Sequence, residues 1–268
     1  MKILILQGGT ALRRRAGSPR TGPSTHDRGV MALGNGQGQW VLINVSPAVA
    51  LQLDSDARLA QHPGLTDAPV RAVLLTDPQV DHVGGLLSLR DGAPIDLYAT
   101  PAVFEQLTSS LPVLPVLQHY CGVHWHVVPV AGDRRAASFR VDGLPSLEFT
   151  ALATQATPPP HLADSDLPQV GDSIALLVQD LDSGPRVFCA PGLASLGDAE
   201  LAWMQGADCL LLDQAAAGIA KGSPWMAQLR ALPARHKVLF GPPAGAAQHQ
   251  ALADHGIALA YDGMQIEI

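Results

Sequence analysis

The sequence predicts an α/β protein in which two β-sheets pack face to face and helices cover their outer sides. Twelve short apolar runs, each bounded by Gly, Pro or Asp, have the length and composition of strands. Helix-like segments lie between them without strict alternation, because the runs at 147–153, 174–178 and 186–190 follow one another as hairpins would. Twelve strands exceed one comfortable open sheet, whereas two stacked sheets would bury them all.

The expected strands share apolar and β-branched residues between turn-forming ones. They are Lys2–Leu6, Trp40–Val45, Arg71–Thr76, Ile95–Ala99, His124–Val130, Leu147–Ala153, Ile174–Val178, Arg186–Ala190, Cys209–Leu212, Lys237–Phe240, Ile257–Tyr261 and Gln265–Ile268.

The expected helices begin at typical start signals. Ser46 before Pro47, and Thr100 before Pro101, place a capping side chain ahead of a proline in the first turn. Further helices are expected within residues 197–207, 223–232 and 244–256. The glycine- and arginine-rich segment 8–38 and the proline-rich segment 157–172 are expected to be long loops, which often carry function.

The composition is that of a globular protein whose partners are not nucleic acids. The chain has 268 residues, 47% of them apolar and 15% charged, and a net charge of −7. We expect one domain over residues 1–268, although two tightly joined halves also fit this length. A homodimer is left open.

Three widely spaced cysteines, with no Cys-x-x-Cys pair, are interpreted as reduced thiols. The apolar run Ile3–Leu6 is too short for a signal peptide or a membrane span, so a cytoplasmic protein is expected.

Polar side chains gather where one predicted strand ends. In the stretch LLTDPQVDHVGG, residues 74–85, an apolar run gives way to Asp77, Gln79, Asp81 and His82. An ordinary structural role is the alternative for each of them: Asp81 would cap a helix, and Asp77 before a proline would initiate a turn.

Two other strand ends carry similar groups. The apolar run from Cys209 stops at Asp213, and the strand at 147–153 leads into a loop containing His161. Carboxylate and imidazole groups on separate strand ends can converge on one metal ion, and such donors suit iron, manganese or zinc. For Asp213 a helix cap is again the alternative. His124 and His126 would face the same side of a strand, but we expect a surface pair there because no third ligand is visible.

The segment TDPQVDHVGGLLSLRDG resembles the metallo-β-lactamase superfamily motif Thr-His-x-His-x-Asp-His. Asp77 and Gln79 stand where that motif has its two leading histidines, whereas Asp81 and His82 are kept. This variant is similar to the pyrroloquinoline quinone biosynthesis protein B family, whose members read T-D-x-Q-x-D-H-x-x-G-L-L at this place.

Other segments extend the resemblance from about Val41 to Ile268. LINVSPAVALQL resembles the family's N-x-S-P segment through Asn44, Ser46 and Pro47. The segments VGDSIALLVQDLDSG, VFCAPGL, ADCLLLD, LPARHKVL and YDGMQIEI also fit that family.

The resemblance implies a four-layer αββα sandwich, the metallo-β-lactamase fold, with a metal site at the edge of the sheets. It implies a place in pyrroloquinoline quinone (PQQ) biosynthesis, as an enzyme that uses iron and oxygen to hydroxylate the tyrosine-derived ring of a glutamate–tyrosine precursor. The alternative is a catalytically reduced relative that carries, transports or binds the quinone or its precursor. A hydrolase is disfavoured, because hydrolytic members need the two-histidine start to hold two zinc ions.

The resemblance also assigns roles to single residues. Asp81, His82 and Asp213 fall on the superfamily's ligand positions, here for a single iron or zinc ion. Asp77 would be a further ligand or a partner of one, and Gln79 would orient a water molecule. The remaining matched residues, His161, Asn44 and Ser46, are assigned to the surrounding loops and the substrate.

Departures from the family pattern reduce the expected site. The N-terminal Cys-x-Cys-x-x-Cys cluster is absent, Gly241 stands at the place of a late histidine, and QAAAGIAKGSPW replaces a Gly-His-x-Pro segment. Because one imidazole is lost, we expect weaker metal binding than in the family.

Overall fold

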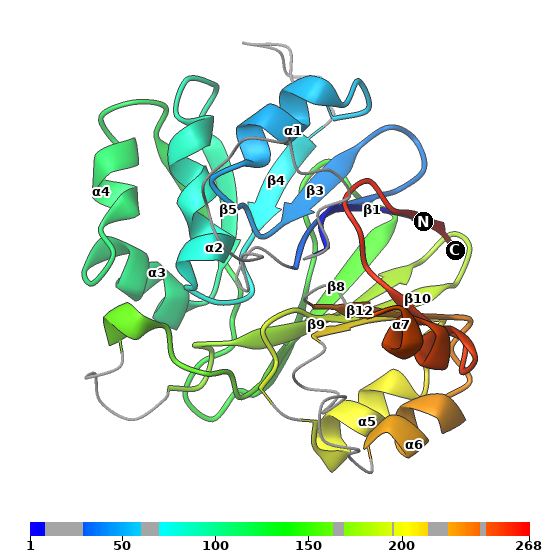
Figure 1. Ribbon diagram of the computed structural model, residues 1–268. Coiled ribbons are helices and arrows are strands. Elements are labelled where there is room, and N and C mark those ends of the chain that lie inside the picture. Colours follow the sequence, from blue (N-terminus) through cyan, green and yellow to red (C-terminus); the bar gives the residue numbers. More distant parts are fainter. Residues whose placement is uncertain (9–28, 60–69, 163–168, 195, 214–224, 242–244) are drawn as a thin grey trace.

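A computed structural model describes residues 1–8, 29–59, 70–162, 169–194, 196–213, 225–241 and 245–268 (Figure 1). Within this part of the chain the strands form two seven-stranded sheets. The sheets lie face to face with helices outside them, so the predicted αββα sandwich is confirmed.

The first sheet has the strand order β14-β1-β2-β3-β4-β5-β6. The four strands from β14 to β3 pair antiparallel, and β3 to β6 pair parallel. The bounds are β1 Lys2–Gln7, β2 Val30–Gly34, β3 Trp40–Ile43, β4 Val70–Leu74, β5 Ile95–Ala99, β6 Val123–Val127 and β14 Gln265–Glu267.

The second sheet has the order β13-β12-β11-β10-β9-β8-β7. Its strands pair parallel from β13 to β10 and antiparallel from β10 to β7. The bounds are β7 Ala136–Phe139, β8 Leu147–Ala153, β9 Ile174–Asp180, β10 Arg186–Ala190, β11 Cys209–Asp213, β12 His236–Phe240 and β13 Ile257–Leu259.

Helices cover the outer face of each sheet (Figure 1). Those on the first sheet are α1 Val49–Ser55, α2 Val80–Val83, the 3-10 helix η1 Gly84–Leu89, α3 Pro101–Thr108 and α4 Val113–Leu117. Those on the second are α5 Asp198–Met204, α6 Trp225–Ala231 and α7 Ala246–Ala253, and a 3-10 turn, η2, spans Pro160–Leu162.

Alternation along the strands divides the apolar side chains among three layers. In β1, Ile3 and Ile5 join the core between the sheets, whereas Leu4 joins the core beneath α1 to α4. The second sheet fills the central core from the other side with Phe149, among others, and packs Phe188 against α5 to α7.

The main correction concerns segment 8–38, which was expected to be a loop throughout. Residues 30–34 form β2, a fully buried strand between β1 and β3. The strand β7 and the short helices α2 and α4 were not predicted either. Helix α1 begins at Val49 with Ala48 as its N-cap, so the predicted capping role of Ser46 is wrong, whereas the Thr100 side chain does cap α3 by accepting from the Val103 amide. Residues 9–28 lie outside the described part of the chain.

Within the described residues, no helix is both long and apolar enough to cross a membrane. All three cysteines are free of disulfides, and Cys189 and Cys209 are buried, as predicted.

Candidate functional site

Two parallel strands bring the predicted residues of the first sheet to one edge. Ile43 of β3 pairs with Leu74 of β4, so the residues that follow both strands emerge together. The Asn44 amide donates to the Leu74 carbonyl at 2.9 Å. Asn44 has a φ of 60°, in the left-handed region that Asn adopts more readily than most residues, and this turns the chain away from the sheet.

Asp77 and His82 form a buried pair at this edge. His82 Nδ1 lies 2.7 Å from Asp77 Oδ1 and 2.8 Å from Asp77 Oδ2. The side chains retain only 1% of their exposure in Asp77 and 7% in His82. A carboxylate accepts hydrogen bonds, so this contact places the ring proton on Nδ1 and turns Nε2 away from Asp77.

Two other donors complete the surroundings of the Asp77 carboxylate. Thr76 Oγ1 donates to Oδ2 at 2.9 Å, and the Gln79 amide donates to Oδ1 at 3.0 Å. The bond from the Gln79 amide forms the local turn that was expected to begin at Asp77. With three donors from its own chain, the Asp77 carboxylate serves to orient His82.

Asn44 supports this pair from behind. Its Nδ2 donates to Thr76 Oγ1 at 2.9 Å and to the Gly29 carbonyl at 3.2 Å, and its Oδ1 accepts from the Thr76 amide at 3.0 Å. Asn44 and Thr76 are completely buried. The sequence did not single out Thr76, although its place one residue before Asp77 was visible.

Two glycines allow the backbone to close over the pair. A Cβ on Gly29 would lie 3.4 Å from His82 Nε2 and 2.4 Å from Pro191 Cβ. A Cβ on Gly192 would lie 3.0 Å from Asp77 Oδ2. Side chains at either position would crowd the imidazole–carboxylate pair, so glycine is required by close approach as well as by the positive φ of both residues.

Ser46 belongs to the framework of the same edge. It is completely buried, and its hydroxyl accepts from the Ala48 amide at 3.3 Å. Beside it, the Val45 amide donates to the His82 carbonyl at 2.7 Å and the Gly85 amide donates to the Val45 carbonyl at 2.9 Å. These contacts hold the two sequence motifs together.

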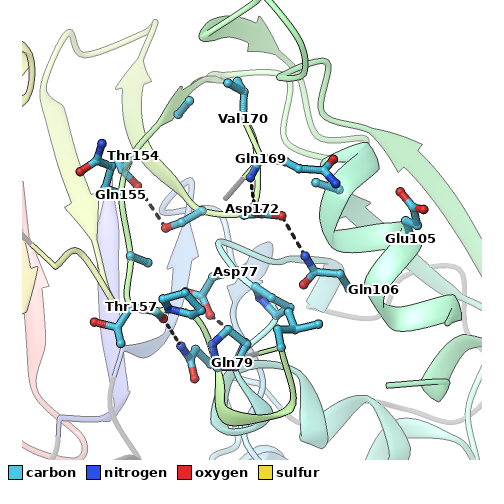
Figure 2. Close-up of a pocket in the computed structure, with 18 of the residues that line it drawn as sticks. Asp77, Gln79, Glu105, Gln106, Thr154, Gln155, Thr157, Gln169, Val170 and Asp172 are labelled. Carbon is cyan, nitrogen blue, oxygen red and sulfur yellow. Dashed lines mark hydrogen bonds between the residues drawn. The ribbon is translucent and has the colours of Figure 1, made fainter. Parts of the chain in front are cut away.

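A cavity of about 730 Å³ opens next to Asp77 and Gln79 (Figure 2). Its walls come from α3, from the end of β8 with the loop after it, and from the residues that precede β9. Gln79 Nε2 donates to the Thr157 carbonyl at 2.9 Å, which joins the Asp77 turn to the proline-rich loop. On the opposite wall, Gln106 Nε2 donates to Asp172 Oδ1 at 2.8 Å.

The sequence anticipated part of this cavity. The proline-rich segment 157–172 supplies several of its lining residues, whereas the expectation that this loop carries function stays a prediction. The contribution of Glu105 and Gln106 was missed, because nothing in the helical segment after Thr100 shows which side chains face a neighbouring loop.

Asp81 and Asp213 are the other predicted ligands, and both are half-buried. Asp81 lies in the first turn of α2, and Asp213 is the last residue of β11. Gln79 is the N-cap of α2 and no side chain caps that helix, so the alternative of Asp81 as a cap is wrong. The described residues contain no group of three or more His, Cys, Asp or Glu side chains that could hold a metal ion. Gly241, which stands where the family has a late histidine, follows β12 directly. The next residues, 242–244, lie outside the described part of the chain.

The remaining histidines take separate places. Burial of His161 lowers its pKa, and its Nε2 atom is buried without a hydrogen-bond partner among the described residues. His126 Nε2 lies 3.0 Å from Asp96 Oδ1, and His124 Nδ1 lies 3.5 Å from the same oxygen. His124 is well exposed, as expected for a pair on the surface of a strand.

Comparison with known proteins agrees with this architecture. Residues 39–260 match the family model of the beta-lactamase superfamily domain. The crystal structure of Zn²⁺-bound PqqB from Methylobacterium extorquens superposes with a TM-score of 0.75 and 22% identity over the whole of both chains. A diphosphatase of the PhnP family gives a TM-score of 0.64 and 17% identity. The fold and the Asp-His strand-end motif therefore define a protein of the metallo-β-lactamase superfamily.

Sequence comparison narrows this class to one family. The chain is 34% identical to coenzyme PQQ synthesis protein B of Klebsiella pneumoniae subsp. pneumoniae, over 95% of this chain and 90% of that protein. It is 33% identical to the protein of the same name from Pseudomonas aeruginosa, over 95% and 91%. The chain belongs to the coenzyme PQQ synthesis protein B family, and the resemblance found in its motifs is confirmed.

Proposed function

We propose that the protein acts in PQQ biosynthesis and that it binds a tyrosine-derived precursor of the quinone in the cavity beside Asp77 and Gln79. The observation that carries this proposal is the cavity itself. Its volume of about 730 Å³ falls in the range of small-molecule sites. It opens beside the buried Asp77–His82 pair, in the region where the family motif follows its strand.

The finer proposal is that the precursor is oxidised by hydroxylation, with molecular oxygen as the oxidant and the help of a single iron ion. A zinc ion, the alternative metal, has no redox chemistry and would serve only to bind the precursor. His82 fits the role of a metal ligand, because its Nδ1 is held by a carboxylate, which fixes the orientation of the ring. We propose Asp81 and Asp213 as the carboxylate ligands. Among the described residues no group of three or more His, Cys, Asp or Glu side chains could hold an ion, so His82, Asp81 and Asp213 would have to approach one another when the ion binds.

The roles assigned to the chain's own residues therefore stop short of a reaction step. Asp77 holds the tautomer and the orientation of His82. Gln79 fastens the proline-rich loop over the cavity through its bond to the Thr157 carbonyl. Such a wall would hold a bound molecule beside Asp77 and Gln79.

A second candidate function is binding or transport of the precursor or the quinone without chemistry. The state of Asp77 favours it. At this position the superfamily motif has a histidine ligand, whereas here the carboxylate is engaged by three donors of its own chain. An engaged carboxylate is a poorer metal ligand than a histidine held for that purpose.

One set of measurements separates these functions. Protein purified after growth with iron or zinc is assayed for metal content, for precursor binding by calorimetry and for a hydroxylated product by mass spectrometry. Turnover that is lost in His82→Ala and Asp81→Ala, but kept in the control His249→Ala, would support the oxidation. Metal below roughly 0.1 equivalent with intact precursor binding would leave the binding function. If the protein binds neither the precursor nor the quinone, its proposed place in PQQ biosynthesis is rejected.

A further inference from the structure

Four buried polar residues form one hydrogen-bonded chain that ends at His82. It runs from the Asn44 amide to the Thr76 hydroxyl, then to the Asp77 carboxylate, then to the His82 ring, with distances of 2.9, 2.9 and 2.7 Å. At most 5% of any of the four residues is exposed. Polar groups at such depth are costly unless their partners are in place, so each member restricts the geometry of the next.

The direction of the chain follows from the donors available. A threonine hydroxyl has one proton, and the Asp77 carboxylate has none to give. Asn44 Nδ2 donates to Thr76 Oγ1, and the hydroxyl has two acceptors within reach, Asp77 Oδ2 at 2.9 Å and Asn44 Oδ1 at 3.1 Å. The hydroxyl proton is directed to Asp77, because the carboxylate is the charged and closer acceptor. The hydroxyl thereby fixes one oxygen of Asp77, and the Gln79 amide fixes the other.

We propose that Thr76 and Asn44 are positioning residues, which set the rotation of the Asp77 carboxylate and through it the Nδ1–H tautomer and orientation of His82. The functional importance of His82 rests on the proposed function, but the geometric claim concerns the protein alone. Asn44 also donates to the carbonyl of Gly29, the residue on which a Cβ would lie 3.4 Å from His82 Nε2. Asn44 thus bonds both to Thr76, which orients Asp77 and through it the imidazole, and to the Gly29 backbone beside the imidazole.

The test uses Thr76→Val, which keeps the shape of the side chain and removes only the hydroxyl. The backbone bond from the Thr76 amide to Asn44 Oδ1 survives this change, and Asn44 Nδ2 keeps the Gly29 carbonyl as a partner. Full-length protein labelled with 15N-histidine is studied by NMR without added metal or ligand, and His82→Gln assigns the His82 signals. We expect an Nδ1–H tautomer in the wild type, and about tenfold faster exchange of that proton with solvent in Thr76→Val.

Two further variants separate positioning from a general loss of stability. Thr76→Ser restores the hydroxyl and should restore slow exchange. Thr100→Val removes another fully buried hydroxyl, which donates to the Gly171 carbonyl at 2.6 Å, and should lower the melting temperature without changing the His82 signals. An unchanged tautomer and exchange rate in Thr76→Val would overturn the inference. A wild type that shows the expected His82 signals but neither binds nor converts the precursor would reject the proposed function and leave the positioning roles standing.

Discussion

The Asp77–His82 pair shows how an aspartate in place of the first histidine changes the role of that position in the motif. With a carboxylate five residues before the histidine, the short helix α2 folds the imidazole back onto that carboxylate. Asp77, at the place of the motif's first histidine, therefore orients the His82 side chain of the same motif. Its contribution should be visible in the stability of the protein, independently of any ligand.

We expect Asp77→Ala to lower the free energy of unfolding by about 2–3 kcal/mol, because it leaves the buried His82 Nδ1 without its acceptor and leaves the Thr76 hydroxyl only Asn44 Oδ1 at 3.1 Å. Urea denaturation measures this loss. The matched control is Asp96→Ala, which removes a partly exposed carboxylate 3.0 Å from His126 and should cost less than about 1 kcal/mol. Equal losses in the two variants would show that the buried pair contributes no more than a surface pair.

The pKa of His161 predicts a pH dependence of stability. Burial lowers its pKa from the ordinary 6.5, and burial together with Arg235 lowers that of His236. Because both pKa values are lower in the folded chain, the unfolded chain binds more protons once the pH falls below 6.5. The free energy of unfolding is therefore highest above pH 6.5, as far as these two rings are concerned, and decreases as the pH falls towards the lowered pKa values. We expect a lower urea midpoint at pH 5.5 than at pH 7.5.

This pH dependence should be smaller in the double variant His161→Gln/His236→Gln. The exposed His249→Gln serves as the control and should keep the wild-type difference between the two pH values. If the double variant keeps it as well, other groups are responsible for the acid sensitivity.

Among single residues, composition and spacing revealed which side chains could carry chemistry, but not which of them touch. The sequence assigned Asp77 as a further metal ligand or a partner of one, and Asp81 and His82 as ligands. Only the fold shows that the first holds the third, because that contact depends on a four-residue helix too short to leave a periodic signal. Thr76 was missed for a related reason, since a threonine at a strand end usually has no special partner.

At the scale of elements, the two motifs of the first sheet stand out as a single packing unit. The loop after β3 lies against η1, and Gly85 is the point of contact. A Cβ on Gly85 would lie 2.1 Å from the Ser46 carbonyl oxygen and 2.7 Å from Val49 Cγ1. The second glycine of the Val-Gly-Gly sequence is therefore required by close approach of two backbones.

Replacing this glycine should separate the two motifs. We expect Gly85→Ala to destabilise the protein by about 3 kcal/mol or more, because the neighbour that must move is backbone. Gly92→Ala is the control, since its Cβ would meet only the Leu89 carbonyl at 3.8 Å, and it should change stability by less than about 0.5 kcal/mol. Thermal melts of both variants measure the difference, and similar melting temperatures would contradict this account of Gly85.

Strands that stand out as separate apolar runs were predictable, and β2 was not. β5, β8 and β10 were located to the residue, because each is a distinct apolar run between turn-forming residues. β2 has only five residues beside a glycine- and arginine-rich segment, and its burial comes from lying between β1 and β3. Pairing with a strand on each side outweighs local composition here.

For the whole molecule, the central core decides whether the two halves of the sandwich are one unit. Alternate residues of both sheets meet in a single apolar cluster, in which Ile43 and Leu74 come from the first sheet and Phe149 and Leu176 from the second. Neither sheet can bury its inner face without the other. The expectation of one domain over residues 1–268 therefore becomes a prediction about cooperativity.

We expect Phe149→Ala, a change in the second sheet, to destabilise the first sheet equally, by about 3–5 kcal/mol. Trp40 and Trp125 belong to the first sheet, and Trp203 and Trp225 to helices of the second half, so replacing the latter two with Phe leaves fluorescence from the first half alone. In that background, Phe149→Ala should shift the fluorescence and far-ultraviolet circular dichroism transitions by the same amount. The exposed Leu181→Ala, as the control, should shift neither appreciably. A fluorescence midpoint that stays in place while the dichroism transition splits in two would show that the halves unfold separately.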